Sequence, residues 1–299
     1  MKIVAFVILC FCCAILFLLL LYLIFSSLLF KKYFGRKKKK FVDEKIEKWW
    51  EGCGAKKVFI ETDDKLKLCG YFVNNFSKQT VIVVHGYGEC AKRMQRYCKF
   101  FYNNHFNVLA VDNRAHGDSQ GDCVGFAWKD SDDLLKWIEF VSSGYDTKIV
   151  LFGVSMGASA VCLLCGKDLP KNVVGAISDC AFSNGLKQIK FESKGRFFGK
   201  FCCKILVFYL KHAQNFDLSK IDIAGEVKKS KIPVLFIHGQ KDDVVLVSNA
   251  FVLYSALPKN LSSKWICDDS GHAETFELHP KDYEKHVLNF LKNKTSLYL

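Results

Sequence analysis

Short apolar runs that alternate with helix-forming stretches constrain the fold of this chain more than any other feature of its sequence. In chain order the runs are TVIVVHG, FNVLAVD, KIVLFG, VVGAISD, IPVLFIHG and KWICDD. Runs of this length, rich in β-branched residues, are typical of buried strands, and intervening helices indicate a mostly parallel sheet covered on both faces. The pattern therefore predicts an α/β fold with ligands bound at the carboxyl ends of the strands.

Two further segments complete this prediction. KKVFIE and LKLCGYFV stand on either side of Asp63–Asp64 and predict a hairpin at the edge of the sheet. Residues 182–231 interrupt the alternation and are rich in Phe and Lys. We expect this insertion to form a helical lid over the strand ends, with a basic face that could contact a membrane surface. Ordinary packing of an inserted helical pair is the alternative.

The first thirty residues predict a transmembrane anchor. Residues 3–30 are apolar apart from the hydroxyl groups of Tyr22, Ser26 and Ser27. This stretch exceeds the about 20 residues that a helix needs to cross a bilayer. A cleavable signal peptide would be shorter and would carry a small-residue cleavage site. We therefore expect three parts: an anchor at 1–30, a basic juxtamembrane linker at 31–55 and one α/β domain at 56–299.

The charge next to the anchor bears on orientation. Residues 31–40 hold seven of the Lys and Arg residues and no acid, in a chain of net charge +13. Because positive flanks favour the cytoplasmic side, we expect a cytoplasmic domain and an external amino terminus. Eleven of the 14 cysteines lie beyond the anchor, an odd number without regular spacing, as expected of free thiols in a reducing compartment. Export of the domain remains the alternative.

The basic segment has two readings that are compatible. It could contact anionic lipid headgroups, or it could serve only as the flank that stops translocation. No nucleic-acid-binding motif accompanies the charge, so no nucleic-acid partner is expected.

The segment Gly153–Val154–Ser155–Met156–Gly157 directly follows the run KIVLF. A G-x-S-x-G string between a buried strand and a helix predicts a sharp turn that lifts the serine hydroxyl above the sheet. A tight structural turn is the plainer interpretation. The position of the string favours Ser155 as a nucleophile.

A serine hydroxyl needs a base, and the base needs an orienting acid. In this fold class both follow the nucleophile in the order acid, then histidine. Asp242 and Asp243 follow the run IPVLFIHG, and His272 follows KWICDD, whereas the other late histidines fall in helices or beyond this loop. His272 is therefore the predicted base, and either aspartate could orient it.

The tetrahedral intermediate needs hydrogen-bond donors for its oxyanion. The N–H of Met156 lies just after the nucleophile at a helix start, and the N–H of Tyr87 lies in the glycine-rich loop HGYGE after TVIVV. We expect these two amides to form the oxyanion hole.

The ordered set HGYGE, DNRAHGDS, GVSMG, HGQKDDVV and GHAE resembles the α/β-hydrolase superfamily. The similarity covers residues 56–295 and is strongest to the branch of monoacylglycerol lipase-like and serine aminopeptidase-like hydrolases, which includes membrane-anchored members. The resemblance implies that Asp242, four residues after the histidine of H-G-x-x-D, is the acid. It also implies that His272 is the base and that Tyr87 and Met156 are the oxyanion donors. The chain departs from the family at Ala115, where glycine is usual.

The predicted function is hydrolysis of a carboxylic ester, thioester or amide through an acyl-enzyme on Ser155. The anchor and the aromatic lid favour a lipid-like acyl ester, such as a monoacylglycerol or a lysophospholipid. An acyltransferase with the same residues and a catalytically silent binding domain displayed at the membrane are the alternatives. No metal or cofactor is expected, since Cys162 and Cys165 lack a second ligand pair and are interpreted as small apolar packing. Acylation of Cys10, Cys12 or Cys13 stays open.

Overall fold

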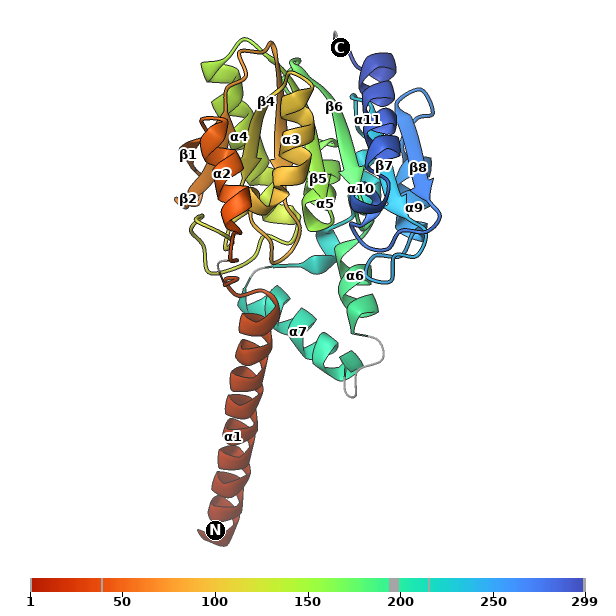
Figure 1. Ribbon diagram of the computed structural model, residues 1–299. Coiled ribbons are helices and arrows are strands. Elements are labelled where there is room, and N and C mark those ends of the chain that lie inside the picture. Colours follow the sequence, from red (N-terminus) through yellow and green to blue (C-terminus); the bar gives the residue numbers. More distant parts are fainter. Residues whose placement is uncertain (1, 39, 194–198, 215, 298–299) are drawn as a thin grey trace.

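A single twisted sheet forms the centre of the computed structural model, which describes residues 2–38, 40–193, 199–214 and 216–297 (Figure 1). Within these residues the sheet has eight strands in the order β1-β2-β4-β3-β5-β6-β7-β8. Strands β1 and β2 form the predicted edge hairpin, β2 pairs antiparallel with β4, and all later pairings are parallel. The strands are β1 (Lys56–Glu61), β2 (Lys67–Val73), β3 (Gln79–Val84), β4 (Asn107–Val111), β5 (Lys148–Val154), β6 (Val173–Asp179), β7 (Val234–Gly239) and β8 (Ser262–Cys267).

Helices cover both faces of this sheet because alternate strand residues point to opposite sides. In β3, Ile82 belongs to one buried cluster and Val81 and Val83 belong to the other. The first cluster includes residues from α4 (Trp128–Gly144), α5 (Met156–Leu164), α8 (Ile223–Val227) and α9 (Ser248–Ala256). The second includes residues from α2 (Glu44–Gly52), η1 (Ala91–Met94), α3 (Gln95–Asn103) and α11 (Pro280–Lys294). The predicted α/β fold, with helices on both faces, is confirmed.

The insertion between β6 and β7 contains α6 (Gly185–Glu192), α7 (Gly199–Ala213) and η2 (Leu218–Lys220) before α8. Residues 194–198 and 215 of the predicted lid lie outside the described residues. In Figure 1, α6 and α7 lie below the sheet, on the side where β5, β6 and β7 end. The insertion is therefore helical and stands at the edge where ligands bind in this class of fold.

Helix α1 (Lys2–Tyr33) projects away from the sheet on this same side (Figure 1). It is long and apolar enough to cross a membrane: its most apolar 18-residue window has a mean hydropathy of 3.4, and none of that window is buried. Two aromatic pairs connect it to α7, with ring centroids 6.3 Å apart for Tyr22 and Phe208 and 6.0 Å apart for Phe30 and Tyr209. Helix α7 thus runs beside the second half of α1.

The stretch predicted as a linker, residues 31–55, is built into the α/β domain. Phe34 is fully buried, with its ring centroid 5.2 Å from that of Phe126 and 5.7 Å from that of Phe216. The Arg36 guanidinium donates to the carbonyl oxygens of the 117–121 loop. Trp50 of α2 is also buried. Phe34 and Arg36 therefore attach the end of α1 to the domain.

Candidate active site

Ser155 stands between β5 and α5 in a strained backbone conformation. Its φ and ψ are 56° and −118°, and its N–H donates to the carbonyl oxygen of Asp179 at 2.8 Å. Positive φ is rare outside glycine and is maintained only where the surrounding structure enforces it. Here a Cβ on Gly153 would collide with the backbone of Gly157, and a Cβ on Gly157 would collide with the backbone of β3. The two glycines of the string therefore allow the turn that exposes the serine hydroxyl.

His272 lies between Ser155 and Asp242. The distance from His272 Nε2 to Ser155 Oγ is 2.9 Å, and the distance from His272 Nδ1 to Asp242 Oδ2 is 2.7 Å. An ionised carboxylate only accepts, so Nδ1 carries the proton that it donates to Asp242, and Nε2 accepts from the serine hydroxyl. The structure brings together all three residues that the sequence predicts, from the loops after β5, β7 and β8.

Asp242 is buried and held by several donors. Its Oδ1 accepts from the backbone N–H groups of Val244 and Val245 at 3.0 and 2.8 Å. Its Oδ2 lies 3.1 Å from Nε2 of His238. Burial alone would raise the pKa of Asp242, but the hydrogen bonds from His238 and His272 outweigh it and hold the pKa well below its ordinary value. The carboxylate thus stays charged, whereas Asp243, which spacing alone leaves open, is exposed.

The loop His85–Glu89 passes directly over Ser155. A Cβ built on Gly86 would lie 3.3 Å from the Ser155 Cβ. Met156 is the first residue of helix α5, and the N–H groups of a helix's first turn have no partner within the helix. The next residue of the loop, Tyr87, donates its hydroxyl to the carbonyl oxygen of Tyr33 at 2.6 Å. Met156 directly follows the serine, and Tyr87 lines the same cavity as Ser155.

Two neutral histidines hold this loop. The sequence alone assigned neither of them a role at the site. His116 Nε2 accepts from the N–H of Gly88 at 3.1 Å, and His85 Nε2 accepts from the N–H of Asn113 at 3.0 Å. Burial lowers the pKa of His116 to about 3 and that of His85 to about 4. Because the rings stay neutral, each Nε2 can accept a hydrogen bond.

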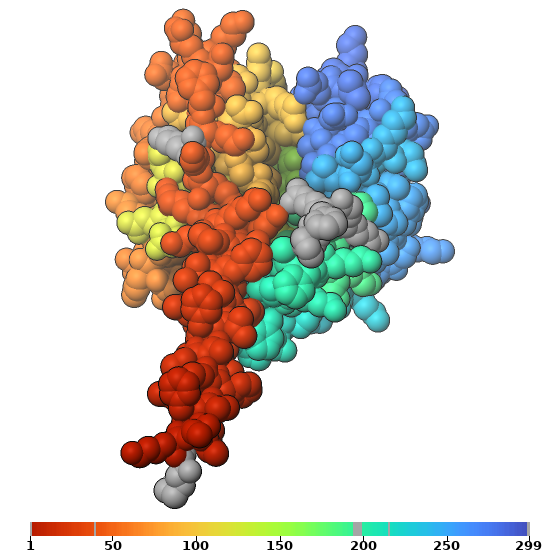
Figure 2. Space-filling model, turned by 90° about the horizontal axis from the view of Figure 1, so that it is seen from below, coloured from red at the N-terminus to blue at the C-terminus, as the bar shows by residue number. Residues whose placement is uncertain are grey.

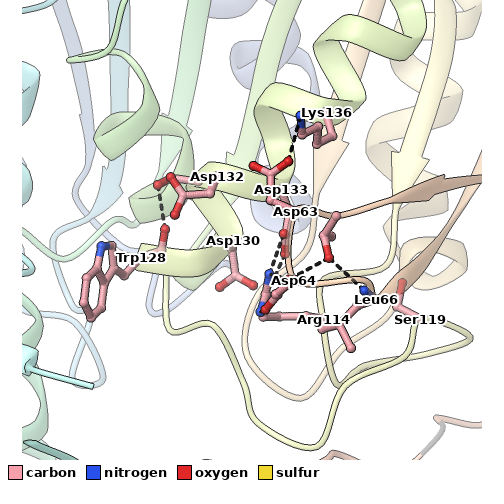
Figure 3. Close-up of polar contacts among 12 residues, drawn as sticks. Asp63, Asp64, Leu66, Arg114, Ser119, Trp128, Asp130, Asp132, Asp133 and Lys136 are labelled. Carbon is pink, nitrogen blue, oxygen red and sulfur yellow. Dashed lines mark hydrogen bonds and ion pairs between the residues drawn. The ribbon is translucent and has the colours of Figure 1, made fainter. Parts of the chain in front are cut away.

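The 112–119 loop has a structural role. Asp112 accepts from the N–H groups of Ala91 and Asp118 at 2.7 and 2.9 Å. Arg114 is buried and donates to Asp133 at 2.6 and 2.8 Å and to Asp64 at 2.8 and 3.2 Å (Figure 3). Ala115 has a φ of 60°, which is why glycine suits this position better.

A cavity of about 1320 Å³ opens beside Ser155 and His272. Pockets for small ligands typically measure about 300–1,000 Å³, so this one has room for more than a short acyl group. Besides those two residues, it is lined by apolar and polar side chains from the loop after β3, the start of α5, the insertion and α1, among them Phe25, Leu29, Tyr33, Tyr87, Met156, Phe182, Ile189 and Leu206.

Cys180, Asp242 and His272 place potential metal-ligand atoms within 4.8 Å of one another. Burial raises the pKa of the Cys180 thiol well above its ordinary value, so this group stays protonated and suits a metal poorly. The Nδ1 of His272 and the carboxylate of Asp242 are also committed to each other. These residues fit a hydrogen-bonded relay better than a metal centre.

Comparison with known proteins gives a consistent result. The family model "Serine aminopeptidase, S33" matches residues 76–221. The protein YqkD of Bacillus subtilis is 28% identical over 220 residues, which cover 72% of this chain and 71% of that protein. Protein bem46 of Schizosaccharomyces pombe is 26% identical over 202 residues, which cover 64% of this chain and 61% of that protein.

Solved structures extend the likeness to the fold. The Pyrococcus furiosus esterase Pf2001 superposes with a TM-score of 0.71 at 25% identity, covering 87% of this chain and 97% of the esterase. The acylaminoacyl peptidase of Pyrococcus horikoshii gives a TM-score of 0.61 at 18% identity, covering 82% of this chain and 42% of that one. These matches, together with the sheet order and the turn at Ser155, support a hydrolase. The fold is that of an α/β hydrolase, and residues 76–221 match the serine aminopeptidase S33 family model.

Proposed function

We propose that this protein is a membrane-anchored serine hydrolase that cleaves a carboxylic ester, thioester or amide through an acyl-enzyme. The observation that carries the proposal is the unbroken hydrogen-bond chain from Asp242 through His272 to Ser155. Such a chain lets a weakly nucleophilic hydroxyl lose its proton as it attacks.

The proposed reaction has two halves, formation of the acyl-enzyme and its hydrolysis, and the same groups act in both. Ser155 Oγ attacks the acyl carbon while His272 Nε2 takes its proton, and the charge of Asp242 stabilises the imidazolium. The N–H groups of Met156 and Tyr87 donate to the oxyanion, a contribution of about 10²–10³ in rate for one donor. His272 then protonates the leaving group. Water repeats the sequence on the acyl-enzyme and releases the acid.

The cavity favours a substrate with a long acyl chain. Its volume of about 1320 Å³ and its apolar side chains suit a lipid-like ester, such as a monoacylglycerol or a lysophospholipid. Membrane attachment through α1 would keep the protein beside such substrates, and the basic flank, with Lys31 and Lys32 exposed, would favour anionic lipid headgroups. A panel of esters of graded chain length tests this preference: rates that rise with chain length support it, and a preference for the shortest ester contradicts it.

Labelling with a fluorophosphonate probe tests the nucleophile. The full-length protein should be labelled, Ser155→Ala should not be labelled, and Ser248→Ala, which changes an exposed serine, should be labelled like the wild type. A folded wild type that resists the probe would instead indicate a silent binding domain. If labelling succeeds, product analysis with and without an alcohol acceptor separates hydrolysis from acyl transfer.

A further inference from the structure

The last turns of α1 line the same cavity as the predicted nucleophile. Phe25, Leu29 and Tyr33 are spaced four residues apart, so they share one face of the helix. Ser155 and His272 line the cavity as well. One helix thus extends from the apolar segment proposed to lie in the membrane to the site of the reaction.

Helix α7 supplies the neighbouring wall. Its Cys203 and Leu206 line the cavity, while Phe201 and Phe208, on its other side, are 60% and 56% exposed. Figure 2 shows α1 and α7 next to each other beneath the domain, and the rings of Tyr22 and Phe208 meet between them. The apolar surface of the two helices therefore continues from the outside of the molecule into the cavity.

The end of α1 is fixed relative to the loop that crosses Ser155. The Tyr87 hydroxyl and the Lys37 ammonium both donate to the carbonyl oxygen of Tyr33, at 2.6 and 3.0 Å. The Lys37 Nζ also stands 4.3 Å from the centroid of the Tyr87 ring. Phe34, the next residue, is fully buried. Because these contacts attach the end of α1 to the loop and the domain, the helix can serve as a wall of a binding site.

We propose that α1 is part of the acyl-binding site as well as an anchor. In this proposal, which rests on the function proposed above, the acyl chain of a membrane-resident ester lies along the face of Phe25, Leu29 and Tyr33, with its carbonyl group at Ser155. The chain passes from the bilayer into the cavity between α1 and α7 without leaving apolar surroundings. The substrate class is therefore a long-chain acyl ester drawn from the membrane, and Leu29 helps to set the chain length accepted.

The test compares two fluorophosphonate probes, one with an ethyl and one with a dodecyl chain, on the full-length protein in phosphatidylcholine vesicles. Leu29→Trp places a large side chain in the cavity. Leu28→Trp is the matched control, since Leu28 is 59% exposed and does not line the cavity. We expect Leu29→Trp to lower the ratio of dodecyl to ethyl labelling rates by about tenfold. This factor corresponds to roughly two methylene groups of the dodecyl chain that are no longer buried. The ratio for Leu28→Trp should equal that of the wild type.

An unchanged ratio in Leu29→Trp, or an equal fall in both variants, would overturn the role of α1 while leaving the hydrolase proposal in place. A wild type that neither probe labels at Ser155 would overturn both. If Leu29→Trp does not accumulate, Leu29→Ala replaces it, with Leu28→Ala as its control. Loss of the leucine contact should also lower the dodecyl to ethyl ratio, and an unchanged ratio would count against the proposal.

Discussion

Asp242 receives more hydrogen bonds than orienting one imidazole requires. Two backbone amides donate to it in addition to His272, and Nε2 of His238 lies 3.1 Å from its Oδ2. These donors fix the carboxylate in one rotamer and keep it charged while it is buried. A neutral side chain of the same shape would preserve the packing but would favour the wrong tautomer of His272.

We therefore predict that Asp242→Asn lowers kcat/KM toward an activated ester by about 10³–10⁴, with little change in thermal stability. The control is Asp243→Asn, which changes an exposed neighbour and should retain wild-type rates. Steady-state kinetics of both variants measures the two values of kcat/KM. Equal losses in the two variants would contradict the assignment.

The principal site residues could be predicted because each follows a buried strand at the carboxyl edge of one sheet. Ser155, Asp242 and His272 needed only the strand order and the motifs to be placed together. The supporting histidines could not be placed in this way. His116 acts on Gly88, and His85 acts on Asn113, so their roles depend on contacts between loops that are distant in sequence. The histidine of DNRAHGDS, His116, was the available signal.

At the scale of elements, the start of α4 contains an unusual carboxyl group. Asp130 is buried, its Oδ2 accepts from the N–H of Ala127 at 2.9 Å, and its Oδ1 has no hydrogen-bond partner. Burial, reinforced by the nearby charge of Asp133, raises the pKa of Asp130 to about 7. In Figure 3 it lies beside the Arg114 cluster without a dashed contact to it.

This raised pKa predicts a pH-dependent stability. Between about pH 4 and pH 7 the native Asp130 binds a proton that the unfolded chain releases, so the free energy of unfolding falls as the pH rises. Asp130→Asn stays neutral and should gain up to about 4 kcal/mol over the wild type by pH 8, from about three pKa units. Denaturant unfolding in detergent at pH 5 and pH 8 measures the part of this gain that develops above pH 5, about 3 kcal/mol. Asp132→Asn, at an exposed position, should follow the wild type; a wild-type slope in Asp130→Asn would refute the prediction.

The segment between α1 and β1 contains structure that the sequence did not predict. Its lysines suggest a solvated linker, yet the segment contains α2 and the buried side chains of Phe34 and Trp50. Charged residues dominate the composition of this stretch. Phe34 and Trp50 follow no helix or strand period, so the sequence pattern does not identify them as buried. By contrast, the strands were predictable because each is a continuous apolar run.

Phe34 should therefore matter for folding. We predict that Phe34→Ala costs about 3–5 kcal/mol of unfolding free energy, because it leaves a cavity between Phe126 and Phe216. Phe41→Ala is the control, since Phe41 is 81% exposed. Denaturant unfolding in detergent measures both variants. A stability loss below about 1 kcal/mol in Phe34→Ala would show that the segment is a true linker.

At the scale of the whole molecule, the basic flank has two distinct tasks. Arg36 and Lys37 donate to carbonyl oxygens of the domain and of the end of α1, so they are engaged within the protein. Lys31, Lys32 and Lys38 are exposed on the surface next to α1. We propose that these exposed lysines contact lipid headgroups and set the orientation of the helix.

We infer the orientation from this charge together with the state of the thiols. All 14 cysteines are free, and eight of the eleven beyond α1 are buried in the domain rather than paired. Free thiols in such number suit a reducing compartment, which agrees with a positive flank on the cytoplasmic side. We predict that a reporter active only in the cytoplasm, fused after Leu299, will be active. A reporter active only outside the cytoplasm, fused at the same position, serves as the reciprocal control, and activity of that fusion alone would place the catalytic domain on the opposite side of the membrane.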